Sequence, residues 1–141
     1  TGLRIGVSAS KGLCFALNIP LISVNTLQSL ASSISIEKGV IIPMLDARRM
    51  EVYSAIFDLD YNQIRETKAE IIDETSFKDI LESLIVHPNV IFVDSKFPSA
   101  NEMSILSYDK YKKNDIEDVA YFEPFYLKDF IAVPQKKKPT F

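Results

Sequence analysis

The feature that most constrains the fold is a succession of three strand patterns joined by short polar turns. Residues 40–45 are continuously apolar, which is typical of a strand covered on both faces. Residues 50–59 alternate, and residues 63–72 form a third strand after a turn rich in aspartate and asparagine. The middle strand has on one face Tyr53, Ala55 and Phe57, and on the other Val52, Ser54 and Ile56. Since connections this short join antiparallel neighbours, we predict a three-strand antiparallel meander.

Two helices and another strand follow the meander. A capping pattern at Ser76 begins one predicted helix, residues 90–93 form a short buried strand, and a second capping pattern at Ser99 begins another helix. Three antiparallel strands followed by helix, strand and helix is the order of a ribonuclease H-like lobe, which actin-like (ASKHA) proteins share. We therefore predict an α/β fold in which residues 39–128 form one such lobe. Residues 129–141, which include three consecutive lysines, are predicted to be a solvated tail.

The first 38 residues have a different pattern. Helical spacing predicts a helix from Thr1 to Leu17, and a short apolar strand follows at residues 21–24. Asn25 then caps a second helix that is predicted to reach Ile34. We interpret residues 1–38 as the closing helix, strand and helix of a preceding lobe of the same kind, whose N-terminal strands are absent from this chain.

The first predicted helix carries two rows of small residues. One row is Gly2, Gly6 and Ser10, and the other is Ala9, Gly12 and Ala16. A glycine inside a helix costs about 1 kcal/mol relative to alanine, so a compensating contact is expected. Close approach of another helix would supply it. Two interpretations remain open, which are packing within the chain and use of the helix at a subunit interface.

The composition excludes several kinds of site. Sixteen basic and nineteen acidic side chains give a net charge of -3, which argues against nucleic-acid binding by a diffuse basic surface. One histidine and one cysteine cannot form a Cys₂His₂ or Cys₄ zinc site, a two-histidine zinc centre or an internal disulfide. No apolar run approaches the ~20 residues of a membrane span. We expect a cytoplasmic protein with no membrane association.

No catalytic, cofactor-binding or metal-ligating constellation is evident in the sequence. The first helix lacks phosphate-loop spacing, and the turn at residues 46–49 has no glycine through which a backbone could approach a phosphate. Cys14 is predicted to be a core residue, and His87 has no partner suited to catalysis. The acidic residues near positions 58 and 115 lie in predicted turns and are expected to be solvated. The lysines at 136–138 either keep the tail in solvent or contact RNA weakly.

Four stretches resemble one known family. Residues 1–13 and 19–27 resemble the shared helix and the following segment of the TsaB (YeaZ) and TsaD proteins, the former glycoprotease family. Residues 46–53, Asp-Ala-Arg-Arg-Met-Glu-Val-Tyr, resemble a signature of the TsaB branch that TsaD lacks. Residues 123–128, Glu-Pro-Phe-Tyr-Leu-Lys, are similar to its C-terminal motif. The chain departs from the family at residues 85–89, where the connection is unusually short.

The resemblance implies a non-catalytic subunit with no cofactor of its own. It implies binding to TsaD, alongside the ATPase TsaE, for N6-threonylcarbamoyladenosine (t6A) modification of adenosine 37 in ANN-decoding tRNAs. ATP and a metal are then expected on the partner subunits, tRNA association is indirect, and a homodimer is expected when TsaD is absent. The alternative is an enzyme of the glycoprotease-like family that acts itself as a peptidase or an ATP-dependent transferase.

The resemblance also assigns residues to these roles. The partner-interface helix residues are Gly2, Leu3, Gly6, Ala9, Ser10 and Leu13. The family-motif residues are Asp46, Arg48, Arg49, Glu51, Tyr53, Glu123, Pro124 and Tyr126.

Overall fold

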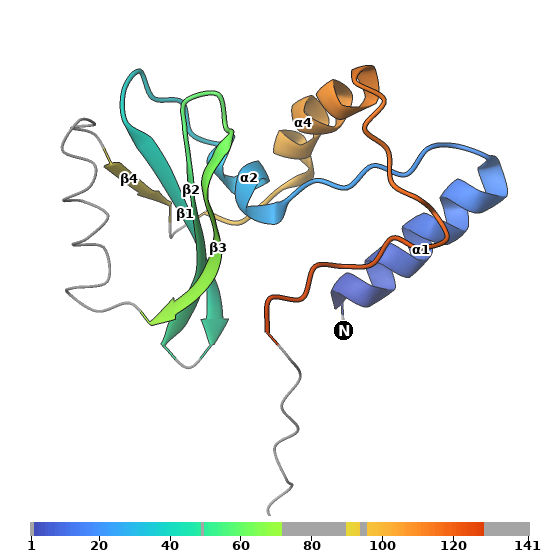
Figure 1. Cartoon of the computed structure of the whole chain (residues 1–141), viewed down its shortest axis with the longest axis horizontal. Helices are drawn as coiled ribbons and strands as arrows, with labels where there is room; N and C mark the ends of the chain where they lie inside the picture. The colour runs from blue at the N-terminus through green and yellow to red at the C-terminus, as the bar shows by residue number, and fades with distance from the viewer. Residues whose placement is uncertain (1, 49, 72–89, 94–95, 129–141) are drawn as a thin grey trace, which may run out of the picture.

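The computed structural model describes residues 2–48, 50–71, 90–93 and 96–128. In chain order the elements are α1 (Gly2–Leu17), α2 (Thr26–Ala31), β1 (Val40–Arg48), β2 (Glu51–Phe57), β3 (Gln63–Ile71), β4 (Val90–Val93) and α4 (Ala100–Lys112). Figure 1 shows the sheet on one side of the molecule, α2 against it, and α1 and α4 on the other side. The predicted helix beginning at Ser76, the short connection at 85–89, His87 and the lysine tail lie outside the described residues.

The described strands form one mixed sheet in the order β3-β2-β1-β4. β1 pairs antiparallel with β2, and β2 pairs antiparallel with β3, so the predicted meander is confirmed. β4 lies parallel to β1, with Ile41 opposite Ile91. The α/β class is therefore confirmed, whereas the assignment to a ribonuclease H-like or actin-like lobe stays a prediction.

Apolar side chains of β1 are buried on both faces of the sheet, as its continuous apolar sequence predicts. On one face α2 packs against the sheet through a cluster of Leu27, Leu30, Ala31, Ile41, Ala55, Phe57 and Val93. On the other face the cluster is Val40, Ile42, Met44 and Ile56. Burying a side chain of this size contributes about 1.5–3 kcal/mol, so these two clusters are the main source of stability among the described residues. The predicted burial of residues 90–93 is wrong at Phe92, which is 40% exposed.

The first hairpin turn differs from the prediction. Asp46, Ala47 and Arg48 belong to β1, and Arg48 pairs directly with Glu51 across the hairpin. The Asp46 carboxylate accepts a hydrogen bond from the Arg48 backbone N–H at 2.7 Å. Arg48 and Met50 have φ of 67° and 64°, which lets the chain reverse over fewer residues than the sequence suggests. β2 likewise ends at Phe57, two residues before the predicted end.

The predicted strand at residues 21–24 is wrong. Leu21 forms a single bridge to Glu117, and the segment otherwise runs without regular structure. A strand needs a neighbouring strand to satisfy its backbone, and none of the described strands lies beside this segment. The Ser23 hydroxyl donates to the Glu117 carboxylate, so this segment is attached to residues near the end of α4.

Asn25 begins α2 as predicted. Its side-chain oxygen accepts from the backbone N–H groups of Leu27 at 2.8 Å and Gln28 at 3.2 Å. The Gln28 side-chain amide donates to the Tyr61 carbonyl at 3.0 Å. α2 ends at Ala31, earlier than predicted, and Ile34 packs against the core from outside the helix.

Ser99 is the N-cap of α4, as the sequence predicts. Its hydroxyl accepts from the Asn101 N–H and donates to the Glu102 carboxylate. The hydrogen bond from Ser99 lowers the pKa of Glu102 from its ordinary value, with a further lowering from the backbone N–H of Glu102. The two side chains therefore form a capping pair at the start of this helix.

Candidate functional site

The helix α1 is apolar and exposed over most of its length. Among its described residues only Cys14 is buried. The large apolar side chains that face solvent are Leu3, Ile5, Leu13, Phe15 and Leu17. A surface helix of a globular protein normally keeps its apolar residues to one protected stripe, so this exposure makes α1 a candidate contact surface.

The glycines of α1 are exposed, with open space beside them. Beyond the helix's own backbone, no described atom lies within 4 Å of the point where a Cβ would sit at Gly2, Gly6 or Gly12. The described residues therefore provide no packing within the chain that compensates for these glycines. Use of the small-residue rows at a subunit interface stays a prediction.

A C-terminal segment runs beside α1, and we name residues 117–128 the strap (Figure 1). The Lys11 ammonium donates to the carbonyl oxygens of Ala120 at 3.0 Å and Phe122 at 2.9 Å. The Arg4 Nε donates to the Tyr126 hydroxyl at 2.8 Å, and the guanidinium lies 5.1 Å from the centre of the same ring. Two cationic side chains of α1 thus contact the strap at two places.

The strap also connects the two family-motif stretches. Lys128 forms an ion pair with Glu51 at the start of β2, and its ammonium lies 5.6 Å from the centre of the Tyr53 ring. Residues far apart in the sequence therefore meet at the β1–β2 hairpin. Asp46 and Arg48 do not join this contact, since their interaction is local to the end of β1. Arg49 lies outside the described residues.

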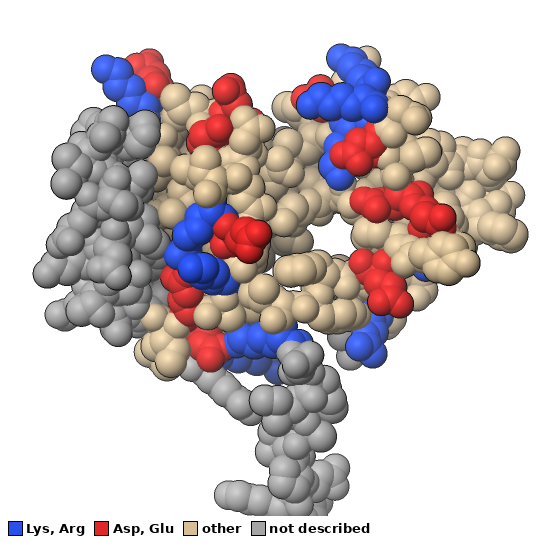
Figure 2. Space-filling model, viewed as in Figure 1, with Lys and Arg blue, Asp and Glu red and all other residues tan. Residues whose placement is uncertain are grey.

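A groove of about 860 Å³ lies between α1, the strap and the sheet. Figure 2 shows the molecule hollowed at this place, with charged side chains around the opening. The predicted residues that line it are Gly2, Leu3, Gly6, Ser10, Tyr53, Glu123, Pro124 and Tyr126. The predicted interface residues Ala9 and Leu13 are exposed but do not line it. The structure thus brings most of the interface residues to the same groove as the C-terminal motif.

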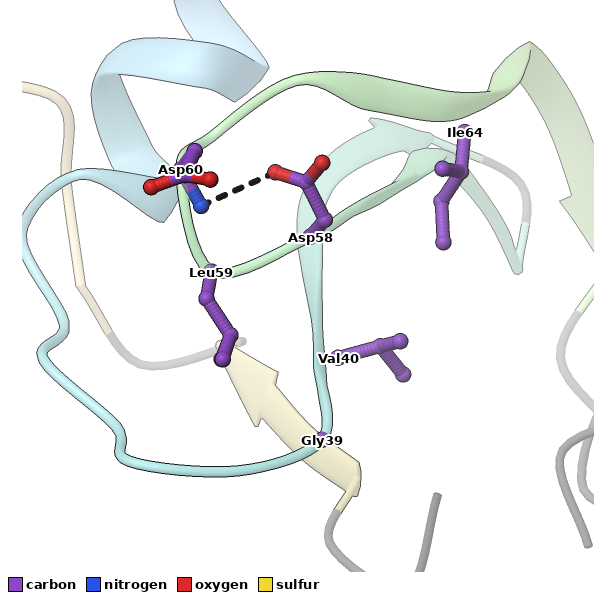
Figure 3. Close-up of a pocket in the computed structure, with 6 residues that line it drawn as sticks. All are labelled: Gly39, Val40, Asp58, Leu59, Asp60 and Ile64. Atoms are coloured by element: carbon purple, nitrogen blue, oxygen red, sulfur yellow. Dashed lines mark hydrogen bonds between the residues drawn. The ribbon is translucent and has the colours of Figure 1, made fainter. Parts of the chain in front are cut away.

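The acidic turn after β2 has a structural role. One Asp58 carboxylate oxygen accepts from the backbone N–H groups of Asp60 at 2.9 Å and Asn62 at 2.8 Å. Figure 3 shows this turn beside a small pocket of about 300 Å³, whose wall includes the apolar side chains of Val40 and Ile64. The prediction of a turn is confirmed, but Asp58 holds the turn instead of being merely solvated.

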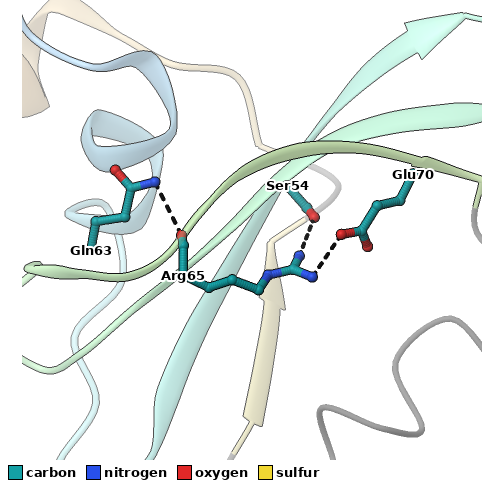
Figure 4. Close-up of polar contacts among 4 residues, drawn as sticks. All are labelled: Ser54, Gln63, Arg65 and Glu70. Carbon is teal, nitrogen blue, oxygen red and sulfur yellow. Dashed lines mark hydrogen bonds and ion pairs between the residues drawn. The ribbon is translucent and has the colours of Figure 1, made fainter. Parts of the chain in front are cut away.

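A polar cluster that the sequence does not predict joins β2 and β3. Arg65 donates to the buried Ser54 hydroxyl at 2.8 Å and pairs with Glu70 at 2.6 Å (Figure 4). Ser54 is fully buried on the face that carries Ile56. A serine between apolar residues of a buried strand signals a polar partner, because a buried hydroxyl is normally hydrogen-bonded. The contacts join neighbouring strands and indicate a structural role.

The described residues contain no group of three or more histidine, cysteine, aspartate or glutamate side chains placed to hold a metal ion. Cys14 is buried, as predicted, and its thiol lies 3.6 Å from the Pro20 carbonyl oxygen. In the part of the chain that the structure describes, none of the helices is both long and apolar enough to cross a membrane.

Comparison with known proteins places these features in a family. A family model described as "TsaD: tRNA N6-adenosine threonylcarbamoyltransferase" matches residues 1–122. A Bacillus subtilis relative, "tRNA threonylcarbamoyladenosine biosynthesis protein TsaB", is 42% identical over 57 residues, which are 40% of this chain and 25% of that protein. The Escherichia coli protein of the same name is 27% identical over 155 residues, covering 94% of this chain and 67% of that protein. The chain belongs to the TsaB (YeaZ) family.

Solved structures agree with this assignment at the level of the fold. "YeaZ from Pseudomonas aeruginosa" superposes with a TM-score of 0.66 at 19% identity, covering 89% of this chain and 68% of that one. A second structure, described as an uncharacterized protein with similarity to peptidase YEAZ from Pseudomonas aeruginosa, gives 0.66 at 21% identity and covers 90% and 68%. The mixed α/β sheet of this TsaB-family chain is therefore similar to that of YeaZ structures.

Proposed function

We propose that this chain acts in tRNA threonylcarbamoyladenosine biosynthesis as a non-catalytic subunit that binds TsaD through α1. The names of the TsaB relatives support the pathway. The observation that carries the binding role is the open face of α1, where no described atom beyond the helix lies within 4 Å of the Cβ position at Gly2 or Gly6. In the proposed assembly TsaE and TsaD hold the ATP and the metal, and tRNA is bound indirectly.

The open face suits a helical partner. Gly2, Gly6 and Ser10 are four residues apart and therefore lie on one side of α1, where small side chains let another backbone come close. Leu13 is 61% exposed and lies near the same side, where a partner would bury it. Covering an apolar side chain of this size contributes about 1.5–3 kcal/mol. The same face would allow a second copy of the chain to bind when TsaD is absent.

The alternative function is enzymatic. It is supported by the description of the matching family model, which names a transferase. In that case the chain itself would act as an ATP-dependent transferase, or as a peptidase. The two functions differ in whether this chain turns over a substrate without a partner.

A reconstitution separates the two functions. TsaD, TsaE, threonylcarbamoyl-adenylate and an ANN-decoding tRNA are combined with and without the full-length protein, and t6A is measured. We expect modification only when the protein is present and none from the protein alone. Undiminished modification without it would disprove the proposed role, and turnover by the protein alone would establish the enzymatic alternative.

A further inference from the structure

We propose that the strap, residues 117–128, is a clasp that fixes α1 against the body of the protein, and that Arg4, Lys11 and Lys128 are its positioning residues. What α1 binds rests on the function proposed above, but the clasp itself concerns contacts within this chain. It gives the C-terminal Glu-Pro-Phe-Tyr-Leu-Lys stretch a structural task, which is to set the position of the interface helix.

Apart from the strap, few described parts of the chain contact α1. None of the other described helices and strands packs extensively against it. Most of its side chains are exposed, and Cys14 alone is buried among those described. The position of this helix therefore depends on the segment that follows it and on the strap.

The contacts on the α1 side come from one face of the helix. Arg4 and Lys11 are seven residues apart, which is close to two helical turns, so both side chains reach the strap from the same side. Lys11 uses two of its three N–H donors on the carbonyl oxygens of Ala120 and Phe122. These carbonyls belong to a stretch with no helix or strand, where a side-chain donor replaces the missing backbone partner.

The strap is preorganised for these contacts. The Asp118 carboxylate accepts from the backbone N–H groups of Ala120 at 2.7 Å and Tyr121 at 3.0 Å. The Phe122 N–H donates to the Asp118 carbonyl at 2.8 Å, which closes a turn. This turn places the carbonyls of 120 and 122 where Lys11 meets them. Pro124 then fixes one backbone angle and keeps the chain extended towards Tyr126.

The opposite end of the strap is attached to the sheet. Lys128 pairs with Glu51 and lies over the Tyr53 ring, so the strap ends on the first residues of β2. Near its other end, the Glu117 N–H donates to the Leu21 carbonyl at 2.8 Å. The strap thus links three places: the segment after α1, α1 itself and the β1–β2 hairpin.

Cys14 provides a built-in probe of the clasp. It is the only cysteine, it is buried on α1, and its thiol lies 3.6 Å from the Pro20 carbonyl oxygen, so a displacement of α1 should increase its rate of reaction with a small disulfide reagent. We compare labelling rates of the wild type, Lys11→Met and Tyr126→Phe, with Lys112→Met as the control. Lys112 lies on α4 over the Tyr108 ring and has no contact with the strap among those described.

We expect Lys11→Met to label about three- to tenfold faster than the wild type, because it removes two hydrogen bonds from a cationic donor. Tyr126→Phe should show a smaller increase, because it removes one such bond and keeps the ring beside the Arg4 guanidinium. The control should label at the wild-type rate. Circular dichroism checks that each variant keeps its sheet. Equal labelling of Lys11→Met and the wild type, with the sheet intact, overturns the clasp.

A second measurement tests TsaD binding separately from the attachment of α1 by the strap. Binding to TsaD is measured for the same variants at one salt concentration. Weaker binding by Lys11→Met supports the positioning role, and unchanged binding despite faster labelling overturns it. If the wild type itself does not bind TsaD, the proposed function fails, while the labelling result still decides whether the strap holds α1.

Discussion

Replacing Gly6 by arginine tests the open face of α1 most directly. A Cβ added at Gly6 meets no described atom within 4 Å, so the longer side chain can extend into solvent in the free protein. Arginine also has a higher helix propensity than glycine, by about 0.5–1 kcal/mol. We therefore expect Gly6→Arg to leave the free energy of unfolding unchanged or to raise it by up to that amount.

The same substitution should prevent partner binding. A second helix that lies close to Gly6 would have to accommodate the guanidinium without an arranged counter-charge. An unpaired buried charge costs about 3 kcal/mol or more, which corresponds to a loss of affinity of roughly a hundredfold. The free protein is thus predicted to be at least as stable as the wild type, while its affinity for TsaD falls roughly a hundredfold.

Two measurements are needed, which are urea unfolding of the free protein and titration calorimetry with TsaD. Ser104→Arg is the matched control, because it adds the same side chain to an exposed position on α4. Gly12→Arg then tests the other row of small residues at another open glycine. Undiminished binding of Gly6→Arg to TsaD would refute the assignment of this face. A loss of more than about 1 kcal/mol of stability would show that Gly6 packs within the protein after all.

The remaining predictions concern the body of the protein. Asn25→Ala should lower the free energy of unfolding by about 1 kcal/mol in urea denaturation, because two N–H groups of α2 lose their acceptor. Arg65→Met should lower it by about 2 kcal/mol, since Glu70 loses its partner in a half-buried site, and a loss below 0.5 kcal/mol would contradict the structural role. Glu102 has a lowered pKa, so its contribution to α4 is present above the ordinary carboxyl pKa and is lost as pH falls through the folded value. NMR titration should show that Ser99→Ala moves the Glu102 pKa back up, and an unchanged pKa would exclude the hydrogen bond as its main cause.

The sequence predicts the parts of the fold that depend on neighbouring residues. The alternation in β2 assigns Tyr53 and Ala55 to one face and Ile56 to the other, and the two core clusters confirm this. The caps at Asn25 and Ser99 are equally local and are also confirmed. The strand predicted at 21–24 is wrong because an apolar run becomes a strand only beside another strand.

The candidate site depends instead on contacts across the whole chain. Lys11 and Phe122 are separated by 111 positions, and neither residue carries a local signal that predicts the hydrogen bond between them. The resemblance identifies the two motif stretches separately and says nothing of a contact between them. The structure supplies the missing relation, since Lys128 of one stretch meets Glu51 and Tyr53 of the other.

The contact of Lys128 with Glu51 and Tyr53 bears on the role of the motif residues. Each of the two stretches contains a glutamate and a tyrosine, and the second also contains a lysine, a combination that resembles a catalytic or ligand-binding set. Here Lys128 is engaged by Glu51, and the Tyr126 hydroxyl is engaged by Arg4. Groups that are already paired within the chain are poorly placed to act on a substrate, because breaking these contacts has a cost. The geometry thus favours motif residues that hold α1, the strap and the hairpin together, which is what the proposed binding of TsaD through α1 requires.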